Sequence, residues 1–465
     1  MSETKKILIL LPDGIGMRNF AYTDFLVTAK AQGLEIIFWN DTALDLAALG
    51  YPQVRTSGLI HWKTHLLKTL RIEFDLSANI RRSGDAIYDR YRFPFSYRNV
   101  RQGLKSLWMH AYLATHSPQK GSVKVRREIK RLERRTPYYR NCVRLLSEER
   151  PDLLFCTNQR IVRAIAPMLA AQDLGIPTAT FIFSWDNLPK ATMALETDHY
   201  LTWSDHMKNE LLHYYDYIRP EQVAVTGTPQ FEPHFQKQRV LPREDFFAQY
   251  RLDAKRKYIC FSGDDVTTSP HDPQYLSDTA DAVRELNAGG HGLGIVFRRC
   301  PVDFSGRYDA VLAKNRDIIT AIDPKWEKMG AAWNTVIPTN ADLDLQVNTI
   351  AHCEMVINLG SSMVFDFVTA GKPCAFINYD VADKGVTGWS VETIYKFVHF
   401  RSMPSRDAVL WIDSPQSIAQ VIRRGLEDKA RTVKAANEWF AKINLQPAEG
   451  ASARIVQEFK KIINA

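Results

Sequence analysis

The sequence predicts an α/β protein with two domains, each built on a parallel β-sheet covered by helices. Its 465 residues exceed the length of one ordinary domain. Apolar runs of strand length, such as KKILILLP (5–12) and KYICFSGDD (257–265), alternate with helix-length segments in both halves. A polar stretch at 236–243 separates the halves. We therefore expect domains at 1–236 and 244–430, with terminal helices at 431–465 that pack back on the first domain.

The composition is that of a globular protein without membrane spans. Hydrophobic residues make up 45% and charged residues 24% of the chain. No apolar run approaches the roughly 20 residues of a membrane span, and the first one, 7–11, is too short for a signal-peptide core. The six cysteines form no CxxC pair, which favours buried free thiols over a metal site. The composition thus favours a cytoplasmic protein. The cysteines are Cys142, Cys156, Cys260, Cys300, Cys353 and Cys374.

The first half opens with a strand, a glycine turn, a helix and a second strand within residues 5–40. The turn, Asp13-Gly14-Ile15-Gly16, lacks the third glycine of a dinucleotide fingerprint because Asn19 fills that position. No dinucleotide cofactor is therefore predicted. Asp13 lies at the carboxyl end of the first strand, where open parallel sheets bind ligands. The structural alternative is a turn-forming aspartate beside glycine.

Residues 54–150 interrupt this α/β pattern and read as a helical, basic insertion. Residues 1–150 contain 26 Lys and Arg against 14 Asp and Glu, and 120–144 alone contains ten against two. Val125, Ile129 and Leu132 recur there at helical spacing. A partly packed helix with a solvated basic face is the simpler interpretation. The functional one is contact of Lys120–Arg144 with anionic lipid or an anionic acceptor.

The second half is organised around 355–380, which reads as strand, Gly360-Ser361-Ser362 turn, helix, Gly-Lys-Pro turn and strand. Ser262-Gly263 and Arg298-Arg299 follow two neighbouring predicted strands. Small residues, guanidinium groups and a helix start at one sheet edge are suited to a diphosphate. The alternatives are simple capping for the serines and surface charge for the arginines.

Three short motifs carry a family resemblance. NLGSSMVFDFVTAGKPCAFINYD (358–380) resembles the carboxyl-terminal signature of GT-B glycosyltransferases, most closely its version in CDP-glycerol glycerophosphotransferases and bacterial sialyltransferase-like enzymes. SWDNLPKATM (184–193) and VTGTPQF (225–231) resemble sequences of bacterial cell-surface glycosyltransferases of this fold. The resemblance does not extend to 54–150. It implies the GT-B fold, in which two Rossmann-like domains face a cleft. The nucleotide-activated donor would bind to the second domain and the acceptor to the first. Neither a metal nor a cofactor is expected.

This chain departs from the resembling families in two respects. Cys300-Pro301 stands where the related enzymes have His-Pro, which disfavours CMP- and CDP-linked donors. The E-x7-E pattern of many retaining GT-B enzymes is not evident, which favours inversion. Inversion requires a general base on the acceptor hydroxyl.

The candidate base is Asp13, then Asp186, with His206 third. Asp186 and His206 also have structural interpretations, as a turn former and a helix histidine. The acceptor-side candidates are Gly14, Arg18, Trp185 and Asn187. The donor-binding candidates are Ser262, Gly263, Arg298, Arg299, Gly360, Ser361, Ser362 and Asp366. Asp366 could cap the helix or reach the donor ribose, and its position favours a structural role.

The sequence thus predicts a cytoplasmic, metal-independent glycosyltransferase that moves a sugar from a nucleotide donor to a cell-envelope glycan or lipid-linked acceptor, peripheral to the inner membrane face. Two alternatives of the same fold are a non-hydrolysing sugar-nucleotide epimerase and a CDP-glycerol-type glycerophosphotransferase. A non-enzymatic nucleic-acid binder would suit the pI of about 9. We expect no nucleic-acid partner, since the basic excess is confined to one third of the chain and no recognition module is visible.

Overall fold

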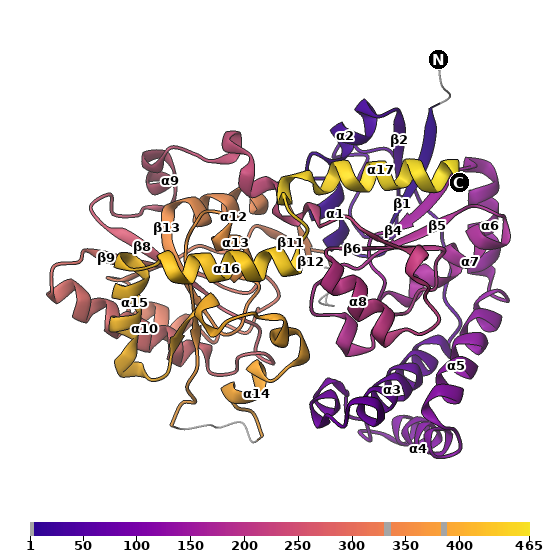
Figure 1. Cartoon of the computed structure of the whole chain (residues 1–465), viewed down its shortest axis with the longest axis horizontal. Helices are drawn as coiled ribbons and strands as arrows, with labels where there is room; N and C mark the ends of the chain where they lie inside the picture. Colours follow the sequence, from indigo (N-terminus) through magenta and orange to yellow (C-terminus); the bar gives the residue numbers. More distant parts are fainter. Residues whose placement is uncertain (1–3, 330–335, 383–387) are drawn as a thin grey trace. The chain divides into compact units, whose positions relative to one another are not determined.

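The computed structural model describes residues 4–329, 336–382 and 388–465 (Figure 1). The chain divides into two compact units, residues 1–228 with 450–465 and residues 229–449. The boundary therefore lies before the stretch expected as a linker, and 236–243 belongs to the second unit. Of the terminal helices, α16 (Ala430–Ile443) lies in the second unit and α17 (Ala451–Asn464) in the first.

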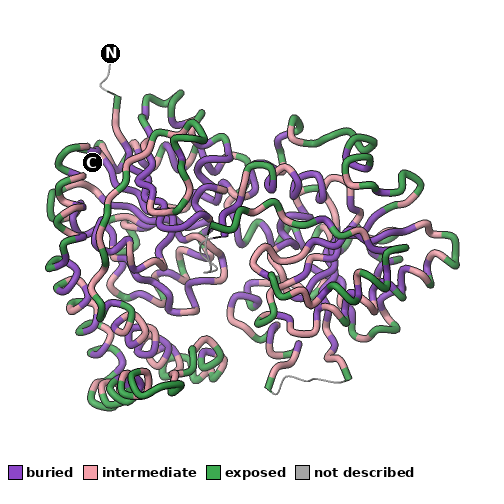
Figure 2. Tube along the Cα trace, turned by 180° about the vertical axis from the view of Figure 1, so that it is seen from behind, coloured by how far each residue is buried: buried purple, intermediate pink, exposed green. Residues whose placement is uncertain are grey.

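The first unit is a seven-stranded sheet in the order β3-β2-β1-β4-β5-β6-β7, with every neighbouring pair parallel. The long apolar runs of β1 and β4 are buried, as expected for strands covered on both faces (Figure 2). The strands are β1 (Lys5–Leu11), β2 (Leu34–Asn40), β3 (Gln53–Val54), β4 (Leu153–Cys156), β5 (Thr178–Phe181), β6 (His199–Thr202) and β7 (Val223–Val225).

Helices α1 (Ile15–Phe20), α2 (Phe25–Ala31), α7 (Ile165–Asp173) and α8 (Asp205–Tyr214) connect these strands. The last helix of the chain, α17, completes this layer. Its Phe459 ring lies 6.1 Å from that of Phe25 and 4.9 Å from that of Phe155. The carboxyl-terminal helix is thus part of the core of the first unit.

The insertion between β3 and β4 is helical, as the sequence predicts. It contains α3 (Thr64–Ser83), the 3-10 helix η1 (Ala86–Tyr91), α4 (Val100–Ala114), α5 (Pro118–Glu133) and α6 (Pro137–Glu149). Val125, Ile129 and Leu132 of α5 are buried. A Cβ atom at Gly121 would lie 2.4 Å from the Phe74 ring, so glycine permits the close packing of α5 on α3.

The second unit is a six-stranded parallel sheet in the order β10-β9-β8-β13-β14-β15, accompanied by the antiparallel pair β11-β12. Its strands are β8 (Lys257–Ser262), β9 (Leu293–Arg298), β10 (Ile319–Ala321), β11 (Trp326–Lys328), β12 (Val336–Pro338), β13 (Cys353–Asn358), β14 (Cys374–Ile377) and β15 (Leu410–Ile412). Its helices are α9 (Arg243–Tyr250), α10 (Asp272–Ala288), α11 (Asp309–Lys314), α12 (Asn340–His352), α13 (Met363–Val368), α14 (Val391–Tyr395), α15 (Ile418–Glu427) and α16.

Each sheet contains one point where the strand order reverses direction. In the first unit it lies between β1 and β4, and in the second between β8 and β13. At such a switch point the loops leaving the two strands diverge and form a crevice at the carboxyl edge of the sheet, where ligands of open α/β sheets bind. The functional residues of each unit are therefore sought at these two edges.

Candidate functional site

The switch point of the first unit carries a buried carboxylate. Asp13 follows β1, is only 3% exposed, and accepts hydrogen bonds from Asn158 Nδ2 (2.6 Å) and the Ile15 amide (3.1 Å). Asn158 follows β4 and is itself fixed by the Arg160 amide, which donates to its Oδ1 over 3.0 Å. The side chains of two adjacent strand ends are thereby joined.

Burial raises the pKa of Asp13, and the hydrogen bond from Asn158 offsets only part of this effect. A carboxylate whose charge is poorly solvated is a stronger base than a surface aspartate. Gly16 helps to place Asn158 beside Asp13. A Cβ atom at position 16 would lie 2.5 Å from Thr157 Oγ1. Glycine therefore lets α1 approach the loop that carries Asn158.

The other predicted residues of the first unit lie in two places. Gly14 precedes α1, whose Arg18 is half-buried. Trp185, Asp186 and Asn187 follow β5. Asp186 is bonded within its own loop: Ser184 Oγ (2.5 Å) and Asn187 Nδ2 (2.7 Å) donate to it, and Lys190 forms an ion pair with it.

Those contacts give Asp186 a local, turn-stabilising role. His206, the third candidate base, lies on α8 with its Nε2 3.7 Å from Glu210, one turn further along the same helix. Neither side chain is bonded to the Asp13–Asn158 pair by any contact found among the described residues. Asp13 is thus the candidate base with the most specific environment.

In the second unit the turn after β13 presents Ser361 and Ser362. Gly360 adopts φ of +69° there, and a Cβ on it would lie 2.9 Å from the Phe400 ring. Asn358 Oδ1 accepts the Ser361 amide over 2.9 Å and holds the turn. Both serines are half-exposed, and the Ser362 hydroxyl forms no capping bond to α13. The Ser361 Oγ accepts the Met363 amide over 3.4 Å, so its hydroxyl hydrogen, like that of Ser362, is left to donate at the β13 edge.

Asp366, one turn into α13, is not directed at a ligand. Its Oδ1 lies 2.8 Å from His234 Nε2, and the two side chains are 3% and 1% exposed. His234 Nδ1 is buried without a hydrogen-bond partner among the described residues. This pair anchors α13 to the segment at the start of the second unit, which favours the structural interpretation of Asp366.

Arg298 is also engaged within the fold. Its Nη2 donates to both carboxylate oxygens of Asp342, at 2.9 and 2.8 Å, in a buried ion pair. Asp342 further accepts the Lys325 amide (2.8 Å) and Trp326 Nε1 (2.6 Å). The Arg298 side chain therefore fastens β9 to α12. The neighbouring Arg299 forms an ion pair with the exposed Asp323, with Nε and Oδ1 2.9 Å apart.

Ser262 ends β8 beside Arg298 of β9, and the Gly263 amide donates to the Arg298 carbonyl over 2.9 Å. A Cβ at Gly263 would lie 2.7 Å from the Tyr308 hydroxyl. This close approach explains the glycine without a ligand. The half-exposed Ser262 remains at the switch point.

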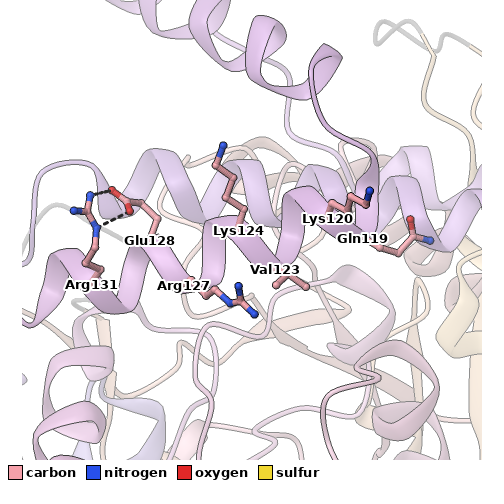
Figure 3. Close-up of a pocket in the computed structure, with 7 residues that line it drawn as sticks. All are labelled: Gln119, Lys120, Val123, Lys124, Arg127, Glu128 and Arg131. Carbon is pink, nitrogen blue, oxygen red and sulfur yellow. Dashed lines mark hydrogen bonds and ion pairs between the residues drawn. The ribbon is translucent and has the colours of Figure 1, made fainter.

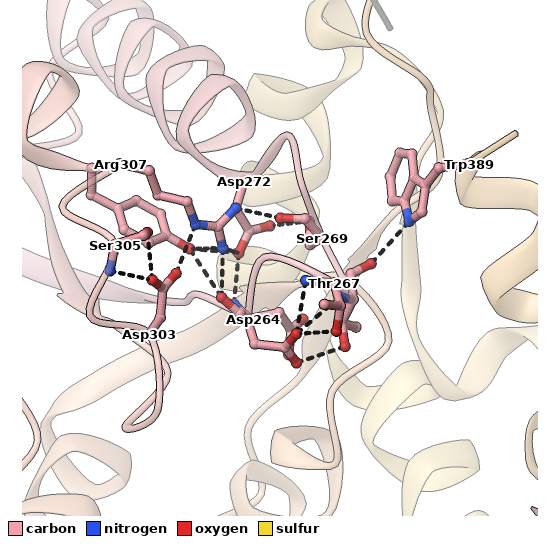
Figure 4. Close-up of polar contacts among 11 residues, drawn as sticks. Asp264, Thr267, Ser269, Asp272, Asp303, Ser305, Arg307 and Trp389 are labelled. Carbon is pink, nitrogen blue, oxygen red and sulfur yellow. Dashed lines mark hydrogen bonds and ion pairs between the residues drawn. The ribbon is translucent and has the colours of Figure 1, made fainter. Parts of the chain in front are cut away.

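A buried carboxyl pair, not anticipated from the sequence, lies in the loop after β8 (Figure 4). Asp272 accepts the Asp264 amide over 2.6 Å, the Tyr308 hydroxyl over 2.9 Å and the Ser269 hydroxyl. Arg307 donates to the Asp264 carbonyl over 2.6 Å. Burial, with the adjacent Asp272 charge, raises the pKa of Asp264 well above its ordinary value, and its Oδ2 is shielded without a hydrogen-bond partner among the described residues. Asp264 therefore keeps its proton to a higher pH than an exposed aspartate does.

The basic segment 120–144 is partly neutralised. Lys130 Nζ lies 2.6 Å and Arg126 Nε 3.7 Å from Glu196, Arg131 pairs with Glu128, and Arg134 pairs with Asp173. The outward face of α5 borders an open hollow of about 590 Å³ (Figure 3). It is lined by Gln119, Lys120, Val123, Lys124, Arg127, Glu128 and Arg131.

All six cysteines are free thiols, and all except the half-buried Cys300 are buried. No group of three or more His, Cys, Asp or Glu side chains that could hold a metal ion occurs within residues 4–329, 336–382 and 388–465. No helix in the same residues is both long and apolar enough to cross a membrane.

Sequence reasoning identified the strand ends but missed the side chains that organise them. Asn158, Asn358 and Asp342 are single polar residues whose partners are distant in sequence or lie across a turn. Only their position in the sequence could have identified two of them, because Asn158 and Asn358 each come at the end of an apolar run.

No protein-family model and no curated protein matches the sequence. Solved structures do match over the whole length. A co-structure of S. aureus MnaA with UDP has a TM-score of 0.53 at 16% identity, covering 99% of this chain and 97% of that one. A putative UDP-N-acetylglucosamine 2-epimerase from Listeria monocytogenes has a TM-score of 0.57 at 11% identity, with 99% and 97% coverage. A glycosyltransferase from Rickettsia africae has a TM-score of 0.53 at 10% identity, with 99% of each chain covered. The chain thus has the two-domain GT-B fold predicted from its sequence.

Proposed function

We propose that this protein is a glycosyltransferase that moves a sugar from a nucleotide-activated donor to an acceptor hydroxyl group. The observation that carries the proposal is Asp13, a buried carboxylate of raised pKa held by Asn158 at the switch point of the first unit. The similarity in fold to a UDP co-structure and to a putative UDP-N-acetylglucosamine 2-epimerase supports the substrate class. The short sequence motifs support a cell-envelope glycan or a lipid-linked acceptor.

In this reaction Asp13 takes the proton of the acceptor hydroxyl as its oxygen attacks the anomeric carbon of the donor sugar. The new carbon–oxygen bond forms as the bond to the diphosphate breaks, and the nucleoside diphosphate leaves with that electron pair. A single displacement of this kind inverts the anomeric centre. The general base contributes a factor of about 10²–10⁴ to such a step.

The donor phosphates are assigned to the second unit. The Ser361 and Ser362 hydroxyls are neutral donors for phosphate oxygens. Arg299 adds positive charge, because its exposed pairing with Asp323 is worth at most about 1 kcal/mol and can be exchanged for phosphate. Arg298 is left out of this role, since its ion pair with Asp342 is buried.

A sugar-nucleotide epimerase is the second candidate, because one of the similar structures is a complex with UDP and another is a putative UDP-N-acetylglucosamine 2-epimerase. An epimerase would convert a nucleotide sugar in the absence of any acceptor. A glycerophosphotransferase would release CMP. A transferase releases nucleoside diphosphate in proportion to acceptor modified.

The first experiment is a thermal-shift screen of the whole protein against UDP, GDP, TDP, CDP and CMP. A nucleotide present at a hundred times its Kd should stabilise the protein by about 2.7 kcal/mol. The double variant Ser361→Ala/Ser362→Ala should lose most of that shift. The sugar conjugates of the selected nucleotide are then incubated with and without acceptor. The proposal would be overturned if none of the nucleotides stabilised the protein. Epimerisation of the nucleotide sugar without acceptor would instead support the epimerase.

A further inference from the structure

Helix α4, part of the helical insertion of the first unit (Figure 1), carries a row of exposed apolar residues. Val100, Leu104, Leu107 and Trp108 are spaced so that they share one face of the helix. Their exposed fractions are 81%, 64%, 65% and 43%. The opposite face contains the residues of α4 that are buried, Ser106 and Met109. A surface helix in contact with water alone carries polar residues on its outward face.

The row continues into the segment before the helix, where Phe93 and Tyr97 are exposed. These six side chains form what we call the α4 apolar surface. Scattered exposed apolar residues are ordinary in a globular protein, whereas contiguous ones mark contact sites. Tyrosine and tryptophan are the aromatic residues that suit a boundary between apolar and aqueous layers.

The segment that carries this surface has basic residues and no acidic ones. Residues 91–127 contain eight Lys and Arg and neither Asp nor Glu. Arg98 and Arg101 are exposed at the start of α4, and no carboxylate among the described residues pairs with them. At the other end, Lys124 Nζ of α5 lies 3.0 Å from His116 Nε2 and 5.6 Å from the Tyr112 ring centre. The basic face of α5 (Figure 3) therefore adjoins the end of α4.

We propose that the α4 apolar surface rests on a membrane that contains anionic lipids, with the apolar row among the acyl chains and the flanking basic groups at the headgroups. Apolar burial and attraction to anionic headgroups together are what bind interfacial helices. A second copy of this chain is the less suitable occupant, because a two-fold contact would bring Arg98 and Arg101 close to their own copies. This inference refines the contact expected from 120–144, where four basic groups are in ion pairs.

The test uses the whole protein with two kinds of vesicle. One kind is neutral phosphatidylcholine, and the other also contains roughly 30 mol% phosphatidylglycerol, which gives it a negative surface potential. Co-sedimentation should show binding to the anionic vesicles, weakened by added salt, and much weaker binding to the neutral ones. Equal binding to both, or binding to neither, would overturn the proposal.

Two pairs of substitutions examine the two components separately. Leu104→Gln with Leu107→Gln should weaken vesicle binding at least tenfold, since two exposed apolar side chains are lost. Arg98→Ala with Arg101→Ala should weaken it about thirtyfold, or about fivefold for each basic group near an anionic surface. All four side chains are exposed, so thermal unfolding should be unchanged.

Matched controls remove similar groups elsewhere. Val27→Gln with Leu49→Gln replaces two exposed apolar residues, and Arg423→Ala with Arg424→Ala removes two exposed charges of α15. Controls that weaken binding as much as the α4 variants would overturn the assignment. Sedimentation equilibrium provides a second check. The assignment would also be overturned if the native protein were a dimer that Leu104→Gln with Leu107→Gln dissociates, while vesicle binding stayed unchanged. Nucleotide-induced stabilisation should be the same in every variant, so this test can fail independently of the proposed function.

Discussion

Exchanging Asp13 and Asn158 would move the carboxylate from the end of β1 to the end of β4 while keeping the hydrogen bonds around it. In the native protein Asn158 Nδ2 donates to Asp13, the Ile15 amide donates to Asp13, and the Arg160 amide donates to Asn158. After the exchange, the new amide at position 13 donates to the new carboxylate at position 158. The two backbone donors keep an oxygen acceptor each.

The single changes do not preserve this arrangement. Asp13→Asn turns an amide NH₂ toward another donor, and a buried donor without a partner costs about 1–3 kcal/mol. Asn158→Asp places two carboxylates in hydrogen-bond contact, so that one must hold a proton. A double-mutant cycle on the free energy of unfolding should therefore show a favourable coupling of about 1–3 kcal/mol, with the exchanged protein close to the native one.

Activity should behave differently from stability. Asp13→Asn should lower kcat by a factor of about 10²–10⁴, which corresponds to about 3–5 kcal/mol in the activation barrier. The kcat of the exchanged protein should remain as low as that of Asp13→Asn. Neighbouring strands are about 4.8 Å apart, so the relocated carboxylate no longer meets the acceptor hydroxyl. Nucleotide affinity, which we assign to the second unit, should be unchanged. Release of nucleoside diphosphate is the assay, and an exchanged protein within tenfold of native kcat would refute Asp13 as the base.

The remaining predictions concern the second unit. Ser361→Ala with Ser362→Ala should weaken nucleotide binding about tenfold to a hundredfold in calorimetry, and unchanged affinity would contradict the phosphate assignment. Gly360→Ala should lower the free energy of unfolding by about 1–3 kcal/mol more than the control Gly371→Ala, because both have positive φ but only the former meets a ring at 2.9 Å. The pKa of Asp264 is raised above the unfolded value of about 3.9, so its folded form binds the proton more tightly. Its contribution to stability is present below pH 4 and is lost as the pH rises through the folded pKa. Between pH 5 and pH 8 the free energy of unfolding should fall less in Asp264→Asn than in the native protein, and an equal fall would contradict the raised pKa of Asp264.

The sequence predicted the sheets and their ligand-binding edges because this information is local. Strand-length apolar runs ended by glycine or proline appear in the structure as β1, β8, β13 and β14, and the turns at Asp13 and Gly360 come at strand ends. The exact strand ends are less local: β4 ends at Cys156 and leaves Asn158, two residues further on, in the loop.

The partners of the polar side chains could not be predicted in the same way. Arg298 and Asp342 are 44 residues apart, and His234 and Asp366 are 132 residues apart. Nothing in the local pattern distinguishes an arginine that faces a ligand from one that faces a buried aspartate. Pairing of this type depends on which helix packs on which strand, and it decides whether a charged residue is structural or available.

The chemistry of the two switch points argues for a division of labour between the units. The first presents a buried carboxylate, which repels phosphate groups and attracts a hydroxyl proton. The second presents two serine hydroxyls, which suit the proposed phosphate site and cannot act as a base near neutral pH. A transferase needs both functions, one for each substrate. An epimerase needs both on the same nucleotide sugar, so its donor-only conversion should be abolished by Asp13→Asn. Acceptor-dependent release of nucleoside diphosphate that is lost in the same variant would instead support Asp13 as the base of a transferase.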